Sequence, residues 1–84
     1  MFLEIVTPDE KIFEGEVQSA TFPGSDGTFQ VLDNHAPLIS TLGKGDIKME
    51  KEVDKRTEWI TFIVDGGIVE ILNNKVTVLA EKIG

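Results

Sequence analysis

The chain has 84 residues, no cysteine and a formal net charge of −7 at pH 7. This length allows one small domain, and the missing thiols exclude a disulfide framework and a thiolate metal site. An acidic chain gains little from releasing counterions, so we expect neither a nucleic-acid partner nor direct insertion into an anionic membrane. The first residues lack the basic start of a signal peptide, and no window approaches a membrane span, which predicts a soluble, intracellular protein.

The first quarter of the chain predicts short strands separated by turns. Phe2–Thr7 is a β-branched run that ends at a turn-forming cluster, Pro8–Glu10. A second strand is expected around Ile12–Phe13, where Gly15 indicates a kink or a bulge. The third strand is expected over Val17–Phe22.

A hairpin and a second turn are predicted in the next stretch. Asp26–Gly27 favours a hairpin because both residues tolerate the positive φ of a type I′ turn. Thr28–Leu32 is the outgoing strand, and Asp33–Asn34 begins the following turn. Pro37 disfavours the helical conformation of the residue before it and leads into a strand over Leu38–Leu42.

The middle of the chain combines one clear strand with two predicted irregular segments. Gly43–Gly45 is typical of a turn. In Asp46–Glu50, polar and apolar residues alternate, so Ile47 and Met49 are expected to face a core. Lys51–Glu58 contains almost nothing apolar and predicts a mobile, solvated loop.

The last third of the chain predicts three more strands. Trp59–Val64 is large and apolar on both faces, which indicates a central strand buried on both sides. Asp65–Gly67 predicts a turn into Ile68–Leu72, and Asn73–Asn74 predicts a hairpin before the closing strand, Lys75–Glu81.

Together these segments predict an all-β fold. No apolar pattern of period 3.6 is sustained along the chain, so no substantial helix is expected. About 8–10 short strands punctuated by Gly, Pro, Asn and Asp indicate a two-sheet antiparallel β-sandwich that forms a single domain over residues 1–84. The side chains expected in its core include Trp59, Phe62, Ile63 and Val78.

The sequence offers little catalytic chemistry. His35 is the only imidazole, so neither a Ser-His-Asp triad nor a zinc site with several nitrogen ligands is indicated. The glycine pairs are not followed by predicted helices and lack the geometry that binds a phosphate. We therefore predict no catalytic, cofactor-binding or metal-binding residue, and two interpretations of His35 remain open. Its ring either bonds to the local backbone or contacts a partner from a projecting loop.

A carrier domain is the alternative function. Ile47-Lys48-Met49 slightly resembles the modified lysine site of biotinyl and lipoyl carrier domains, which are β-sandwiches of similar size. Such a lysine must lie at an exposed hairpin tip, whereas Lys48 is predicted inside an alternating strand.

Several motifs occur in the order found in one known family. Gly24–Gly27 followed by Asn34–Ile39 resembles the G-S-x-G turn and the H-A-P-L-L segment of the epsilon subunit of F-type ATP synthases (the delta subunit in mitochondria). The segments that flank this pair and resemble the same family are Glu4–Pro8, Phe13–Val17, Gly66–Ile71 and Asn74–Ala80. The chain departs from the family at Asp33–Asn34, where Pro-Gly is common.

The resemblance implies a non-catalytic rotor part. In that family the sandwich binds the gamma subunit on its side and the ring of c subunits with its bottom loops, and it couples proton flow to ATP synthesis. The positions that fall on the ring-facing segment are Thr28, Phe29, Gln30, Val31, Leu32, Asp33, Asn34, His35, Ala36 and Pro37. Thr7 and Pro8 fall near the gamma side.

The resemblance also implies where the protein works and what it lacks. The expected place is the cytoplasmic face of a bacterial inner membrane, as a peripheral part of the synthase and without a cofactor. Most family members continue into a two-helix C-terminal hairpin, whereas this chain ends at Gly84. We expect a naturally short form, to which inhibition of ATP hydrolysis and binding of ATP cannot be transferred.

Overall fold

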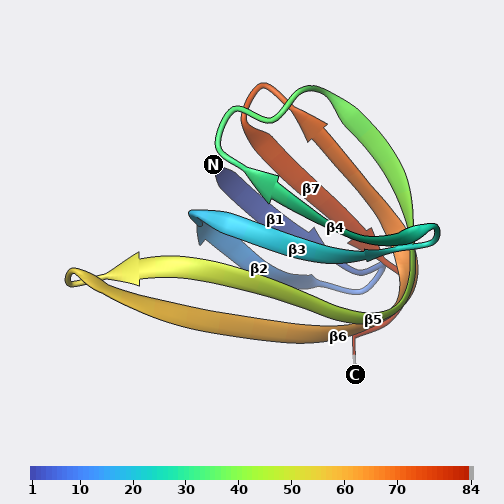
Figure 1. Cartoon of the computed structure of the whole chain (residues 1–84). Coiled ribbons are helices and arrows are strands. Elements are labelled where there is room, and N and C mark those ends of the chain that lie inside the picture. Colours follow the sequence, from blue (N-terminus) through green and yellow to red (C-terminus); the bar gives the residue numbers. More distant parts are fainter. Residues whose placement is uncertain (84) are drawn as a thin grey trace.

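A computed structural model describes residues 1–83, which form one seven-stranded sheet with the order β2-β1-β7-β6-β5-β3-β4 (Figure 1). The strands are β1 (Phe2–Val6), β2 (Lys11–Glu16), β3 (Ser19–Gly24), β4 (Gly27–Leu32), β5 (Leu38–Val53), β6 (Arg56–Leu72) and β7 (Lys75–Ala80). The described residues contain no helix that is long and apolar enough to cross a membrane. The prediction of an all-β sandwich is confirmed, but the strands form one sheet and not the two separate sheets that were predicted.

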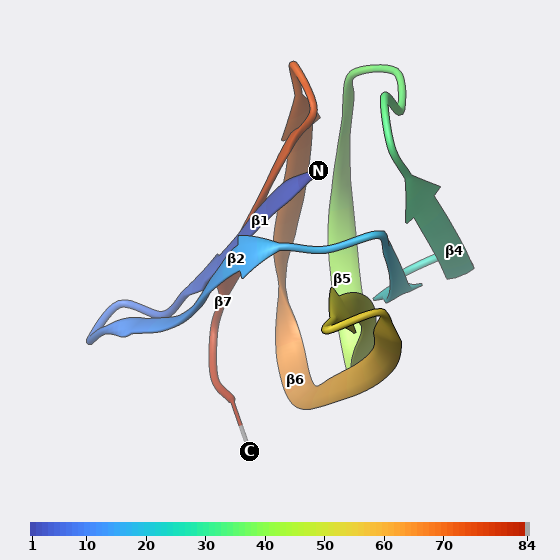
Figure 2. The ribbon, with the colours of Figure 1, turned by 90° about the vertical axis from the view of Figure 1, so that its left-hand side faces the viewer.

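The sandwich arises because the single sheet curls back on itself (Figure 2). One layer holds β2, β1 and β7 with the later part of β6, and the other holds β3 and β4 with the later part of β5. β5 and β6 pair along almost their whole length and run through both layers. The strands are fewer than predicted because each of these two long strands takes the place of two short ones.

The predicted turns at Gly43–Gly45 and Asp65–Gly67 are wrong. Both segments lie inside the long strands, and Lys44 pairs with Asp65 across them. Gly67 has a φ of +148°, and a Cβ built on it would lie 2.4 Å from the carbonyl oxygen of Leu79. The glycine is therefore needed for a bend and a close backbone approach within the sheet, and not for a reversal of the chain.

The predicted loop at Lys51–Glu58 is also wrong, because these residues form the end of the β5–β6 hairpin. Its turn is Asp54–Lys55, with φ angles of 50° and 64°. We call residues 51–58 the arm, and they project beyond the rest of the sheet (Figure 1). A hydrogen bond of 2.6 Å from Gln18 Nε2 to Glu52 Oε2 ties the base of the arm to the connection between β2 and β3.

Only one face of each layer is covered. The core lies between the layers, and its fully buried large side chains are Leu3, Ile5, Phe22, Val31, Ile47, Met49, Val64, Val69, Ile71, Val76 and Val78. The prediction that Ile47, Met49 and Val78 face the core is confirmed. The prediction that Trp59 and Ile63 are buried is wrong, because they are 64% and 51% exposed on the outer face of β6, where no further layer packs.

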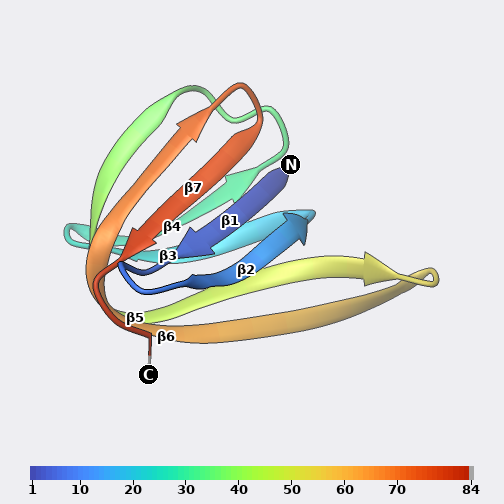
Figure 3. The same ribbon diagram turned by 180° about the vertical axis from the view of Figure 1, so that it is seen from behind.

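One strand pairing differs from the predicted antiparallel pattern. β1 and β7 are parallel, with Phe2 opposite Lys75 and Val6 opposite Leu79 (Figure 3). No tight turn joins these strands, so their relative direction is free of the hairpin constraint. The Asn73–Asn74 hairpin is confirmed, and both residues have positive φ, as a type I′ turn requires.

Two local details also differ from the prediction. The β3–β4 hairpin lies where it was expected, but its turn residues are Ser25 and Asp26, and only Gly27 has positive φ. The irregularity in the pairing of β1 with β2 lies between Ile5 and Val6, and Gly15 pairs regularly with Leu3.

Candidate partner-binding surfaces

The predicted ring-side segment begins on β4, which is an edge strand that pairs only with β3. Its side chains alternate as a half-buried strand requires. Thr28, Gln30 and Leu32 are exposed, whereas Val31 is fully buried. Phe29 is half-buried and packs against Phe22 with ring centroids 5.5 Å apart. The exposed side chains are available to contact a partner, whereas Val31 and Phe29 pack against the core and anchor the strand.

The rest of this segment is the loop between β4 and β5. Asn34 adopts a φ of +59°, and its backbone N–H donates to Asn74 Oδ1 at 2.8 Å. His35 is half-buried, and its Nδ1 lies 2.7 Å from the carbonyl oxygen of Ala36. Ala36 and Pro37 are exposed. Because a turn and the neighbouring hairpin fix this loop, it presents its exposed residues on a rigid support.

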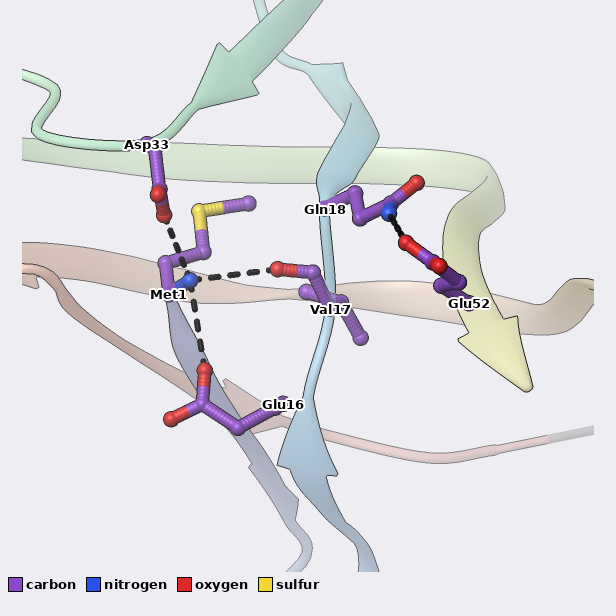
Figure 4. A pocket seen from close by; sticks show the side chains of 6 residues that line it. All are labelled: Met1, Glu16, Val17, Gln18, Asp33 and Glu52. Atoms are coloured by element: carbon purple, nitrogen blue, oxygen red, sulfur yellow. Dashed lines mark hydrogen bonds and ion pairs between the residues drawn. The ribbon is translucent and has the colours of Figure 1, made fainter. Parts of the chain in front are cut away.

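The amino terminus lies directly under this loop, a feature that the sequence analysis missed (Figure 4). The Met1 ammonium donates to Asp33 Oδ1 at 2.6 Å and to the carbonyl oxygen of Val17 at 3.1 Å, and it lies 3.3 Å from Glu16 Oε2. These residues line a shallow open pocket together with Gln18 and Glu52. No local sequence pattern signals the contact, because it joins segments that only the sheet topology brings together.

The electrostatics of this contact are consistent with a stable ion pair. Burial disfavours the charged form of the Met1 amine, but hydrogen bonds with Asp33 and Glu16 outweigh it, and the pKa of the amine is raised. The hydrogen bond from the Met1 ammonium lowers the pKa of Asp33. Both groups are therefore charged at neutral pH.

The predicted gamma-side residues, Thr7 and Pro8, lie at the other end of β1. Thr7 is half-buried, and its backbone N–H donates to the carbonyl oxygen of Glu10 at 2.9 Å, while Pro8 is exposed. The predicted ring-side and gamma-side residues therefore lie apart. Asp33 contacts Met1, just before β1 begins, whereas Thr7 follows the last residue of β1. Thr7 and Pro8 share a shallow pocket with Leu79.

Leu79 also belongs to a cluster of exposed apolar side chains that was not predicted from the sequence. Ile39, Ile68 and Leu79 are 71%, 44% and 54% exposed, and they line one small pocket with Glu70 and Thr77. We call Ile39, Ile68 and Leu79 the outer-face patch. Exposed apolar clusters of this kind are typical of interaction surfaces. The alternation with the buried Val69 and Val78 could have indicated the patch.

The described residues offer no cluster of metal-ligating side chains, and Lys48 does not occupy the position of a carrier lysine. Within residues 1–83, no group of three or more His, Cys, Asp or Glu side chains could hold a metal ion. Lys48, the candidate for a carrier domain, is exposed in the middle of β5 and pairs with Thr21 and Thr61. It does not lie at a hairpin tip, which a modified lysine needs, so no observation favours the carrier function.

Comparison with known proteins decides the family. Residues 1–83 match the ATP synthase, Delta/Epsilon chain, beta-sandwich domain. The chain belongs to this family. Its resemblance to ATP synthase epsilon subunits, predicted from the motifs, is confirmed, and the family name is that of a subunit rather than of a stand-alone enzyme.

Epsilon chains from several organisms show the similarity. The ATP synthase epsilon chain of Chlorobium limicola is 40% identical over 81 residues, which cover 96% of this chain and 89% of that protein. The epsilon chain of Salinibacter ruber is 38% identical over 86 residues, but these cover only 58% of its length. The chain thus spans little more than half of some relatives and nearly all of another.

Two solved structures show the same fold. One is a cryo-EM structure of the Euglena gracilis mitochondrial ATP synthase, with a TM-score of 0.87, 21% identity and coverage of 98% of this chain and 51% of that chain. The other is the central stalk and c ring of the Tetrahymena thermophila mitochondrial ATP synthase, with a TM-score of 0.77, 17% identity and coverage of 99% and 64%. At these identities the likeness concerns the fold alone.

Proposed function

We propose that the chain is a non-catalytic central-stalk subunit of a proton-translocating F-type ATP synthase, where it binds the gamma subunit and the c ring. The observation that best supports this function is the match of residues 1–83 to the family's β-sandwich domain. The protein would then work as a peripheral part of the complex at the cytoplasmic face of a bacterial inner membrane. It would help couple proton flow to ATP synthesis elsewhere in the complex.

The ring side of the domain would be formed by Thr28–Pro37. This segment offers exposed residues along the edge strand β4 and in the loop that follows it. His35, Ala36 and Pro37 lie in that loop, whose backbone is fixed at Asn34. Such a loop binds with a small loss of conformational entropy, because its shape is already set before the partner arrives.

The gamma side would be formed by Thr7 and Pro8 with the outer-face patch. Leu79 lines pockets with both groups, so the two surfaces are continuous. Glu70 and Glu81 border the same pockets and are exposed. We therefore expect the partner to bring an apolar surface bordered by basic residues, because complementary charge guides such contacts.

The fold suits a part that transmits torque. β5 and β6 run without interruption through both layers, so the two layers are linked by continuous hydrogen-bonded strands as well as by the packed core. Close-packed interiors deform little and transmit strain. A load applied to the loop at one end of β1 would thus reach the surface at the other end.

The test is purification of the tagged chain from native membranes. Recovery of the gamma, alpha and beta subunits supports the proposed function, and their absence would contradict it. Leu79→Glu should lower recovery of gamma at least about tenfold, because it places a charge in the centre of the patch. Trp59→Glu is the matched control, since it replaces another exposed apolar side chain outside the patch.

The ring side needs a separate measurement. Ala36→Glu should lower ATP-driven proton pumping in membrane vesicles while ATP hydrolysis persists, because the substitution changes an exposed residue of the ring-facing loop. Thr61→Glu, on the outer face of β6, is the control and should leave pumping unchanged. Equal pumping by both variants would remove Ala36 from the contact.

A further inference from the structure

The Met1 amine occupies an unusual place for a chain terminus. The Met1 side chain is only 1% exposed, and the amine contacts residues that follow β4 and that connect β2 to β3 (Figure 4). Terminal residues are usually poorly ordered unless a contact holds them. Here the amine is held by a carbonyl oxygen and by two carboxylates.

Of the two carboxylates, Asp33 makes the closer contact. Asp33 Oδ1 lies 2.6 Å from the Met1 nitrogen, whereas Glu16 Oε2 lies at 3.3 Å and the Glu16 side chain is 76% exposed. Asp33 is also the first residue of the loop that ends at Pro37, and the next residue, Asn34, is held by Asn74. The loop is thus fixed at its start by the Met1 amine and by the β6–β7 turn.

The charges around the amine explain why its positive charge matters. Glu16, Asp33 and Glu52 line the same pocket, and Met1 contributes its only cationic group. Without the ammonium, the residues that line this pocket would carry three carboxylates and no positive charge, which disfavours their charged forms. The Asp33 side chain would then gain by turning towards water, and the loop would lose one of its two supports.

We propose that, in a chain that begins at Met1, the free α-amino group is a positioning group for the Asp33–Pro37 loop, so that the loop's order depends on the modification state of that amine. An acyl group on this nitrogen removes the charge and leaves one N–H donor in place of three, while the strand pairing of β1 is expected to stay intact. The same loss would follow from any residue placed before Met1. This inference concerns contacts within the chain and goes beyond the proposed function.

The test compares synthetic 84-residue chains that have either a free or an acetylated amine. Each is made with Asp33 and with the substitution Asp33→Asn. Two NMR readouts are measured: the pH titration of the Asp33 carboxyl carbon, and the backbone heteronuclear NOE of Asn34, His35 and Ala36. Acetylation should move the pKa of Asp33 back towards its ordinary value and lower the NOE of the loop amides.

Comparison of the four chains separates loss of the Met1–Asp33 contact from a general effect of acetylation on the fold. In the Asp33→Asn background, acetylation should have little further effect on the loop, because the two changes remove the same interaction. Glu16→Gln is the matched control, and it should leave the loop NOE unchanged. An unchanged Asp33 titration after acetylation, or an equal loss of order in both backgrounds, would overturn the proposal.

Folding is monitored separately through the methyl resonances of Leu3 and Ile5, which are fully buried. If acetylation shifts these core resonances, the proposal is tested with the Asp33→Asn chain that has a free amine. Its loop must lose order while the core resonances stay in place, and an ordered loop in that chain would overturn the proposal. None of these measurements requires the gamma subunit or the c ring, so a failure of the proposed function would not affect them.

Discussion

Gly67 occupies a backbone position that other residues cannot take without strain. Its φ of +148° is rare for residues with a side chain, and a Cβ would lie 2.4 Å from a backbone oxygen of β7. Neither the oxygen nor the strand can move freely, because β7 pairs on both sides. The residue therefore determines how closely β6 and β7 approach each other at the bend.

We expect Gly67→Ala to lower the free energy of unfolding by about 2–4 kcal/mol, from backbone strain together with overpacking. Gly27→Ala is the matched control, since Gly27 has a φ of +128° but nothing lies within 4 Å of its added Cβ. The control should cost about 1 kcal/mol, from strain alone. Urea unfolding measures both values, and equal losses would contradict the importance of the close approach.

The contact between Met1 and Asp33 should depend on pH at both ends of the range. The pKa of Asp33 is lowered, so its contribution to stability is present above the ordinary value of 3.8 and is lost as the pH falls through the folded pKa. The pKa of the Met1 amine is raised, so its contribution is present below the ordinary value of 8.0 and is lost as the pH rises through the folded pKa.

We therefore expect the amide chemical shift of Asn34 to be constant near neutral pH and to change above pH 8.0. Besides Asp33, the charged groups around the amine are Glu16, whose Oε2 lies 3.3 Å away, and Glu52, which lines the same pocket, while Lys75 lies over the ring of Phe2. Asp33→Asn should lower the midpoint of this change, because it removes the closest stabilising carboxylate. An unaltered midpoint would show that Asp33 does not hold the amine.

At the scale of the strands, the arm shows how an exposed apolar residue can resemble a core residue. Trp59 is 64% exposed at the base of the arm, although it begins an apolar run. We expect Trp59→Ala to cost less than about 1 kcal/mol, because surface positions contribute little to stability. Ile47→Ala, in the fully buried core, should cost about 2–5 kcal/mol. Comparable losses in urea unfolding would contradict the exposure of Trp59.

The sequence predicted strands correctly where the alternation of polar and apolar residues, or the turn residues beside a strand, provided a local signal. β1, β4 and β7 lie close to their predicted ranges, and Asn73–Asn74 turns as expected. Prediction failed where a residue's role depends on distant chain segments. Gly67 serves an approach to β7 rather than a turn, and the arm is a hairpin because β5 and β6 pair to their ends despite its polar composition.

The candidate surfaces, too, could be predicted only where they depend on local sequence. The exposure of the Asp33–Pro37 loop could be expected from its turn residues. The Met1 contact could not be predicted, since it joins residues separated by 32 positions in the sequence. The outer-face patch could be predicted only in part, because alternation indicates two faces but not which layer covers them.

At the scale of the whole molecule, stability should depend on the partner. A small domain has a limited core, and a ligand that binds only the folded state stabilises it by mass action. With the gamma subunit at about one hundred times its Kd, we expect a gain of about 2.7 kcal/mol and a higher Tm. Calorimetry with Leu79→Glu provides the control, and an equal Tm with and without gamma would count against binding.

The parallel pairing of β1 with β7 affects how the protein can be made. In the sheet, β1 and β2 join the other strands only through β7, which is the last strand of the described residues. While the ribosome is still making β7, the β1–β2 hairpin has no sheet to join, and isolated hairpins are marginally stable in water. The sandwich can therefore assemble only after β7 has been made, and until then the nascent chain exposes its apolar strands to chaperones and proteases.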